Sequence, residues 1–450
     1  MIKLNGLTAT KGCLVAAAAL IMVPTAAQAQ LAPAQVQAAL KSDKTAQELR
    51  AFYATRGHRP LWVRGATVGP EADALMKLID TAYSDGLEPA NYKPRALATA
   101  IKKGREGSPK ALAKAEVLLS QAMAAYVRDV RKPRDSGMIY VDRELAPTVL
   151  KPSAVLAGAA AAPSLVQYLN NLGWMHPVYG QLRETFASAA EGSRLNQAQE
   201  MLLRVNMDRA RALPSRVAGR HILVDAAAAQ LYLYENGQVV DTMNVVVGKP
   251  DLQTPMMAGL IRYAMVNPYW NIPPDLVRNR IAQNVLDQGL GYLKAKRYDV
   301  LDDWSEDAKV IDASKVDWRA VAAGTKEVPV RQRPGANNAM GKMKFMFPNK
   351  EGVYLHDTPD KELFKEADRG ASAGCVRVED AQRLAKWLFG KPLTTKSKKP
   401  EQKVNMPAPV PVYITYLTAA PAGQHVSFRK DVYNRDPLAI AQLRGALASR

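Results

Sequence analysis

Two short segments decide the fold of the chain: VYLHDTP at residues 353–359 and SAGCVR at residues 372–377. The first is an apolar run of strand type that ends near His356. In the second, Gly374 permits a tight turn directly before Cys375. The segments therefore predict a strand and a turn that carry a histidine and a cysteine within one β-rich domain.

A histidine, a turn glycine and a cysteine in this order are suited to nucleophilic catalysis. Histidine can take the thiol proton and return it to a leaving amine, and backbone N–H groups at the turn can hold an oxyanion. A helical pattern begins at about Glu379, so we expect the helix start and Arg377 to favour the thiolate form of Cys375. Each residue taken alone is also explained by packing or exposure, and a single cysteine is often a buried, inert side chain.

The N-terminus has the pattern of a secretory signal peptide over residues 1–29, with a charged start, a short apolar run and an A-x-A end at Ala29. An uncleaved anchor is the alternative, but the apolar run is too short to span a bilayer. Cleavage would remove Cys13 and leave Cys375 as the one cysteine, which excludes an internal disulfide. We therefore expect a periplasmic protein.

The composition sets broad limits on the class of protein. The 450 residues, of which 48% are hydrophobic, are enough for two or three domains with a sizeable core. The net charge of +19 favours an anionic partner such as nucleic acid, a membrane surface or a cell-wall polymer, or reflects only a solvated basic surface. Nucleic acid is disfavoured by the predicted export, and the lysine-rich tract at 391–403 lacks interleaved aromatic residues.

The hydrophobic periodicity divides the chain into regions that predict an α+β fold. Residues 30–215 have helical patterns and predict a scaffold domain. Residues 216–422 contain short strand-like runs, with an Asn-Gly hairpin signal at 236–237, and predict a β-sandwich-like catalytic domain. A helical pattern interrupts that domain, and we expect an insert at about 274–340 to act as a lid. Residues 423–450 form a C-terminal extension in this scheme.

The segment SAGCVR, with His356 upstream on a strand, resembles the active-site motif of the YkuD-type L,D-transpeptidases. One departure is Ala373, where many members of the family have histidine. The resemblance extends to the large YcbB-like branch, strongly over 206–435 and more weakly over 45–92. The segments that carry it include NMDR at 206–209, VGK at 247–249, QTP at 253–255, NPYWNIP at 267–273, RQRPG at 331–335, KFMFP at 344–348 and PVYITYL at 411–417.

The resemblance implies a helical scaffold followed by a β-rich YkuD catalytic domain. It also implies a role for each residue of the motif. These roles are nucleophile for Cys375, general base for His356, oxyanion binding by the backbone amides at Gly374 and Cys375, and orientation of His356 or the turn for Ser372.

The resemblance further suggests residues that bind substrate. Arg377 could hold the active-site loop or meet a substrate carboxylate, and Tyr354 and Trp270 are candidates for the substrate cleft. Core packing explains both aromatic residues equally well. No metal or organic cofactor is expected, because thiol, base and oxyanion site suffice for acyl transfer, and the five histidines show no paired zinc-ligand spacing.

The implied reaction is peptidoglycan cross-linking. Cys375 would attack the third residue of a tetrapeptide stem, release the terminal D-alanine, and pass the acyl group to a second stem to give a 3→3 cross-link. A carbapenem-type β-lactam is the expected inhibitor. Two alternatives stay open at this point: a hydrolase with the same acyl-enzyme, and an inactive wall-binding scaffold. The oligomeric state is not predicted.

Overall fold

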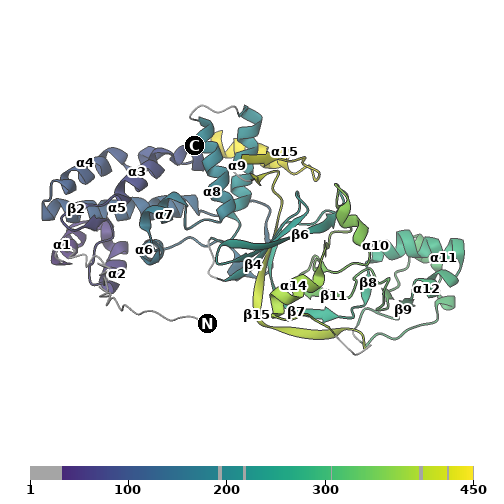
Figure 1. Cartoon of the computed structure of the whole chain (residues 1–450). Helices are drawn as coiled ribbons and strands as arrows, with labels where there is room; N and C mark the ends of the chain where they lie inside the picture. Colours follow the sequence, from purple (N-terminus) through teal and green to yellow (C-terminus); the bar gives the residue numbers. More distant parts are fainter. Residues whose placement is uncertain are drawn as a thin grey trace, which may run out of the picture.

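The computed structural model is elongated, with a helical scaffold at one end, a large β-sheet in the middle and the insert at the other end (Figure 1). The predicted signal peptide lies outside the described residues. These are residues 33–190, 195–215, 219–305, 307–394, 399–422 and 425–448.

The helices fall into three groups. The scaffold contains α1 (Pro33–Ser42), α2 (Gln47–Thr55), α3 (Glu71–Asp80), α4 (Pro94–Arg105), α5 (Pro109–Val130), α6 (Pro152–Ala161), α7 (Leu165–Asn170), α8 (Pro177–Ala190) and α9 (Gln197–Arg211). The insert contains α10 (Pro274–Leu276), the π-helical turn η5 (Val277–Ala282), α11 (Gln283–Gln288), α12 (Gly291–Ala295) and α13 (Trp318–Ala322). The others are α14 (Ala381–Phe389) and α15 (Asp436–Ala448). Short 3-10 turns are η1 (Lys44–Ala46), η2 (Ala82–Asp85), η3 (Pro89–Tyr92), η4 (Arg143–Leu145), η6 (Ala313–Lys315) and η7 (Lys361–Lys365).

Most strands belong to the catalytic region. Its large sheet contains β3 (Ile139–Tyr140), β4 (Arg220–Asp225), β5 (Gln230–Glu235), β6 (Gln238–Gly248), β7 (Met257–Val266), β11 (Met343–Met346), β12 (Leu355–His356), β13 (Gly370–Ser372), β14 (Val376–Val378) and β15 (Gln402–Thr415). Smaller sheets are formed by β1 (Val63–Arg64) with β2 (Thr67–Val68), by β8 (Trp270–Ile272), β9 (Tyr298–Val300) and β10 (Val330–Gln332), and by β16 (Ala419–Ala422) with β17 (His425–Phe428).

The predicted α+β class is confirmed, and the Asn-Gly hairpin joins β5 to β6 with φ of 49° at Asn236 and 79° at Gly237. The large sheet of the predicted β-sandwich-like domain is continuous. Its strands run in the order β11-β12-β14-β6-β5-β4-β15-β7, and β7 also pairs with β11, so the hydrogen-bonded path closes on itself. The strands are long, and the register of β15 against β7 shifts between Asn405 and Val410. Such a shift bends a strand, which allows the sheet to curve until its first and last strands pair.

The scaffold and the catalytic region are joined more closely than the predicted boundary at 215 implies. Strand β3 comes from the scaffold part of the chain, yet it pairs with β7. The core of the scaffold also includes Leu223, Tyr234 and Tyr413 from strands of the large sheet. The scaffold core therefore extends onto residues of the sheet, whereas the sheet also has a second core of its own.

The last residues are not a separate extension. Helix α15 packs against α9, and the β16–β17 hairpin contacts α8. An ion pair between Arg209 Nη1 and Asp436 Oδ1, at 2.7 Å with both side chains buried, fixes α15 to α9. The C-terminal segment thus returns to the junction between the scaffold and the sheet, as Figure 1 shows.

The insert is a small unit of its own rather than a purely helical lid. Strands β8, β10 and β9 form an antiparallel sheet, and a core that includes Val277, Trp318 and Val330 lies beneath it. That core shares no member with the core of the large sheet. Helical periodicity before residue 300 concealed the strands, because each is only three residues long.

The insert leaves the sheet close to His356. Its entry strand β7 and its exit strand β11 pair at Val266 and Met343, and the next residue, Lys344, pairs with His356. We expect replacement of residues 274–329 by a short Gly-Ser turn to lower acyl transfer about 10²-fold, because an element that positions substrate is lost. The thermal unfolding midpoint of the sheet should change little, and unchanged turnover would contradict a lid role.

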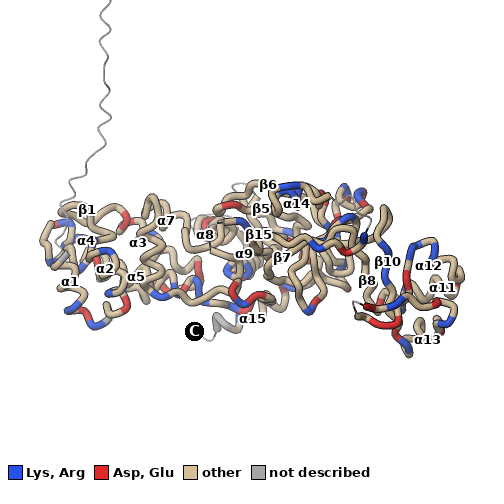
Figure 2. The backbone as a smooth tube through the Cα atoms, turned by 90° about the horizontal axis from the view of Figure 1, so that it is seen from below, with Lys and Arg blue, Asp and Glu red and all other residues tan. Residues whose placement is uncertain are grey.

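None of the helices in the described ranges is both long and apolar enough to cross a membrane. Lys and Arg positions are spread over the scaffold, the sheet and the insert, with Asp and Glu positions among them (Figure 2). The net charge is therefore distributed along the molecule.

Candidate active site

The pairing of β12 with β14 brings the predicted site residues to one face of the sheet. The strands are parallel, with His356 beside Arg377 and Leu355 beside Val376, and the Val376 N–H donates to the Tyr354 carbonyl at 3.1 Å. Alternation along a strand places the neighbours of Leu355 on the opposite face from it. Tyr354, His356, Cys375 and Arg377 therefore share a face, which the sequence could predict only for the first two.

Cys375 is a half-buried thiol that follows the turn after β13. Its Sγ lies 3.4 Å from the Gly352 carbonyl oxygen, to which it donates. Burial raises the pKa of the Cys375 thiol, although hydrogen bonds from Tyr354 and the charges of Arg377 and Lys344 act in the opposite direction. Arg377 thus favours the thiolate as expected, but burial outweighs its effect on the pKa, and the thiol needs a base.

The predicted effect of a helix N-terminus on Cys375 is wrong. Strand β14 lies between the cysteine and the helix, and α14 begins only at Ala381. Its first turn is capped by Asp380, whose Oδ1 accepts the Arg383 N–H at 2.9 Å. The positive end of the helix is thus already occupied by a carboxylate.

His356 is buried, and its contacts define its tautomer. Nδ1 lies 2.6 Å from the backbone carbonyl oxygen of Asp357, which can only accept, so Nδ1 carries the proton. The lone pair of Nε2 is then available to take a proton. Burial, followed by the charge of Arg377, lowers the pKa of His356 to about 3, so the imidazole is neutral at physiological pH.

Asp357 orients the histidine through its backbone rather than its side chain. Its carboxylate accepts the Lys342 N–H at 2.8 Å and pairs with Lys361 Nζ at 2.8 Å. Successive side chains of a strand point to opposite faces, so this carboxylate and the His356 ring lie on different sides of the sheet. The carbonyl contribution was not predictable, because it depends on the turn that follows β12.

Ser372 holds the turn. Its hydroxyl donates to the Cys375 carbonyl at 2.6 Å and accepts the Gly374 N–H at 3.1 Å. The φ of 109° at Gly374 is a conformation that residues with a side chain rarely adopt. Since the Gly374 N–H is engaged, the expected pair of oxyanion donors is reduced: the Cys375 N–H, which makes no hydrogen bond to the described residues, is the donor that remains.

Lys344 is a site residue that the sequence reasoning did not single out. It pairs with His356 across β11 and β12 and is only 8% exposed. Its Nζ lies 3.3 Å from Glu401 Oε1 and 5.9 Å from the centre of the Tyr354 ring. A lysine inside an apolar strand was the signal that could have revealed it, because buried lysines require partners.

Arg377 and Trp270, which were also predicted to bind substrate, lie in different parts of the structure. Arg377 lies on the site face, with Nη1 3.7 Å from Asp360 Oδ2, and its buried Nε has no hydrogen-bond partner among the described residues. Trp270 instead lies on β8 and packs against the core of the insert. Of the two aromatic residues, only Tyr354 lies on the face of the sheet that carries His356 and Cys375.

We expect acylation of Cys375 to be independent of pH between about pH 5 and pH 8, because His356, whose pKa is about 3 against an ordinary value near 6.5, stays neutral there. The rate should fall only as pH drops toward the pKa of His356, where the base is protonated. Stopped-flow acylation by a carbapenem at constant ionic strength measures this, with circular dichroism to confirm folding at each pH. A protonation step near pH 6.5 would contradict the neutral imidazole.

The described part of the chain contains no cluster of three or more His, Cys, Asp or Glu side chains placed to hold a metal ion.

Comparison with known proteins assigns two regions of the chain. Residues 219–412 match the family model of the L,D-transpeptidase catalytic domain, YkuD, and residues 47–186 match a scaffold-domain model. The chain thus contains a YkuD L,D-transpeptidase catalytic domain preceded by a scaffold domain, and the resemblance found in the sequence is confirmed.

Particular relatives carry the same description. A Haemophilus influenzae protein named provisionally as an L,D-transpeptidase is 26% identical over 403 residues, which cover 86% of this chain and 78% of that protein. An L,D-transpeptidase from Mycobacterium smegmatis matches with a TM-score of 0.22 and 14% identity over 44% of this chain and 58% of the other. An L,D-transpeptidase solved in complex with imipenem matches with a TM-score of 0.21 and 15% identity over the same shares. This chain thus spans little more than half the length of these solved chains.

Proposed function

We propose that this protein is a periplasmic L,D-transpeptidase that forms 3→3 cross-links in peptidoglycan through a thioacyl-enzyme on Cys375. The observation that carries the proposal is the shared face of the sheet. His356 and Cys375 lie on this face; His356 Nδ1 donates to the Asp357 carbonyl, which leaves the Nε2 lone pair available as a base, and the imidazole is neutral at physiological pH.

The first half-reaction transfers an acyl group to the enzyme. The Cys375 sulfur attacks the carbonyl carbon of the third stem residue, usually meso-diaminopimelate, while His356 Nε2 takes the thiol proton. The Cys375 N–H stabilises the oxyanion that forms. The bond to D-alanine then breaks, and His356 returns the proton to the leaving amine.

The second half-reaction releases the acyl group. The side-chain amine of another stem attacks the thioester, His356 takes its proton, and the thiol is restored as the new amide forms.

In this proposal Arg377 binds a substrate carboxylate, since its buried Nε has no hydrogen-bond partner in the described structure. Tyr354 forms the adjacent wall. A carbapenem would acylate the same thiol.

The test uses purified full-length mature enzyme with disaccharide-tetrapeptide, followed by mass spectrometry of the products, with Cys375→Ala as the matched inactive variant. Dimers joined 3→3, absent for the variant, are expected. Tripeptide monomers without dimers would replace the transpeptidase by a hydrolase with the same acyl-enzyme. If incubation with a carbapenem adds no mass to the wild-type protein, the wall-binding scaffold without catalytic activity would replace the proposed enzyme.

The periplasmic location is proposed from residues 1–29 alone. Expression of the full chain should give a mature protein that begins at Gln30 in the periplasmic fraction, as read by N-terminal sequencing. An unprocessed chain in the membrane fraction would favour the anchor.

A further inference from the structure

Thr254 connects the active-site turn to the remainder of the molecule. It is fully buried, and its hydroxyl donates to the Gly374 carbonyl oxygen at 2.8 Å. The same hydroxyl accepts the Gly248 N–H at 2.8 Å. Gly248 must be glycine here, because a Cβ at this position would lie 2.1 Å from the Leu252 carbonyl oxygen.

The hydrogen bond from Thr254 to the Gly374 carbonyl also affects the Cys375 N–H, because both groups belong to the same peptide unit. A peptide unit is planar and trans, so the carbonyl of Gly374 and the N–H of Cys375 point in opposite directions. A hydroxyl that fixes the carbonyl therefore fixes the direction of the N–H. That N–H is the remaining oxyanion donor of the site.

The C-terminal segment holds Thr254 from two sides. The Tyr433 hydroxyl donates to the Gly248 carbonyl at 2.6 Å and accepts the Thr254 N–H at 3.5 Å. Arg435 Nη2 donates to the Thr254 carbonyl at 2.9 Å, and its Nε donates to Gln253 Oε1 at 3.0 Å. Every polar group of Thr254 is thus engaged, half of them by residues about 180 positions away in sequence.

The segment that carries Tyr433 is itself rigid. The Tyr433 ring stacks on Tyr416, with ring centres 4.9 Å apart and an angle of 12° between the planes. Tyr416 Oη accepts the Tyr433 N–H at 2.9 Å and donates to Asp431 Oδ1 at 2.8 Å. Because these contacts do not depend on the Tyr433 hydroxyl, that hydroxyl can be removed while the ring stays in place.

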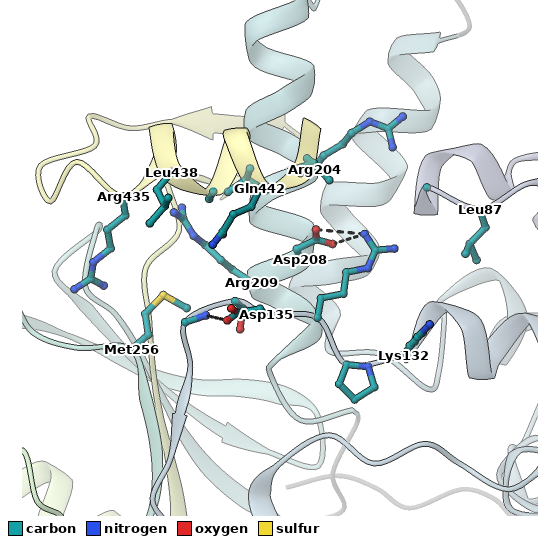
Figure 3. Close-up of a pocket in the computed structure, with 18 of the residues that line it drawn as sticks. Leu87, Lys132, Asp135, Arg204, Asp208, Arg209, Met256, Arg435, Leu438 and Gln442 are labelled. Carbon is teal, nitrogen blue, oxygen red and sulfur yellow. Dashed lines mark hydrogen bonds and ion pairs between the residues drawn. The ribbon is translucent and has the colours of Figure 1, made fainter. Parts of the chain in front are cut away.

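Arg435 also faces a cleft of about 1690 Å³ that is lined by residues of α9, of α15 and of earlier scaffold segments. Figure 3 shows Arg435 and Met256 on one side of this cleft, with Leu438 of α15 nearby. The side chain can therefore be shortened or made neutral without opening a closed void.

We propose that Tyr433 and Arg435, acting through Thr254, are positioning residues that aim the Cys375 N–H at the oxyanion of acyl transfer. The inference rests on the proposed function, because it requires an oxyanion at Cys375. It assigns the C-terminal segment a part in catalysis that no residue of the SAGCVR motif supplies.

The test measures carbapenem acylation of the full-length mature enzyme over a range of carbapenem concentrations. It gives two quantities: the acylation rate constant at saturating carbapenem, and the carbapenem concentration at which half of that rate constant is reached. Tyr433→Phe should lower the saturating rate constant about tenfold, the effect of one lost positioning hydrogen bond, and leave the half-saturating concentration unchanged. Arg435→Met should lower the saturating rate constant several-fold. The matched control is Tyr140→Phe, which loses a hydrogen bond to the Ala212 carbonyl away from the turn and should acylate like the wild type.

Thr254→Ser and Thr254→Val separate positioning from packing. Serine keeps the hydroxyl and should retain the rate, whereas the valine variant should lose roughly 10- to 100-fold, approaching the loss of an oxyanion donor. Rates are taken on folded protein, with unfolding midpoints recorded alongside. A wild-type rate constant for folded Tyr433→Phe would overturn the inference alone. A wild-type enzyme that is not acylated would overturn the proposed function as well.

Discussion

Replacement of His356 by Asn is expected to lower the rate of Cys375 acylation by roughly 10²- to 10⁴-fold, the usual contribution of a general base. The asparagine amide N–H can still donate to the Asp357 carbonyl, so the turn after β12 keeps its hydrogen bond, but no basic nitrogen is left to receive the thiol proton. The measurement is the growth of the acyl-enzyme mass with time at saturating carbapenem.

The pH dependence of His356→Asn gives a second readout. Burial raises the pKa of the Cys375 thiol, so without a base the thiolate is scarce at neutral pH. The residual rate should increase about tenfold per pH unit across the neutral range, where the wild-type rate is flat. His425→Asn, an exposed histidine on β17, is the matched control and should behave as wild type. Equal rates in His356→Asn and wild type would rule out His356 as the base.

Replacement of Asp85 by Asn is expected to lower the free energy of unfolding by about 3–5 kcal/mol, the cost of removing one member of a buried ion pair. The Asp85 carboxylate is buried and pairs with Arg183 Nε at 2.8 Å. It also accepts hydrogen bonds from the hydroxyls of Tyr126 and Tyr179, at 2.5 Å and 2.6 Å. The substitution leaves the guanidinium of Arg183 without its counter-charge inside the scaffold.

Urea denaturation followed by circular dichroism measures this loss. Asp73→Asn is the matched control, because Asp73 pairs with Arg105 in the same scaffold but both side chains are largely exposed. That substitution should cost no more than about 1 kcal/mol. Similar losses for the two variants would show that the Asp85 cluster does not hold the scaffold together. Since residues of the large sheet belong to the scaffold core, we expect the Asp85 variant to unfold both regions together.

The sequence was sufficient wherever a property depends on neighbours along the chain. The Asn236-Gly237 turn has the positive φ angles that its residue types favour, and α14 stops at Gly390, whose φ is 72°. The family was recognisable because His356 and the turn with Cys375 are short local motifs. Three-residue strands such as β9 and β10 were missed, since so few residues carry no clear periodicity.

The protonation states required the tertiary structure. The sequence predicted a favoured thiolate from Arg377 and a helix start, but β14 separates Cys375 from the helix, and burial raises the pKa of the thiol. Burial also decides that His356 is neutral. Desolvation depends on how completely other segments cover a group, and sequence spacing does not contain that information.

The amino-acid sequence by itself thus identified the family and predicted Cys375 as the nucleophile and His356 as its base, because these depend on local motifs. Only the tertiary structure decided that Lys344 stands beside His356 and that Thr254 and Tyr433 hold the turn of Cys375. The physical reason is strand register and hydrogen bonding between distant segments. Thr254 meets Gly374 across 120 positions and Tyr433 across 179, and only the folded chain brings such residues within hydrogen-bonding distance.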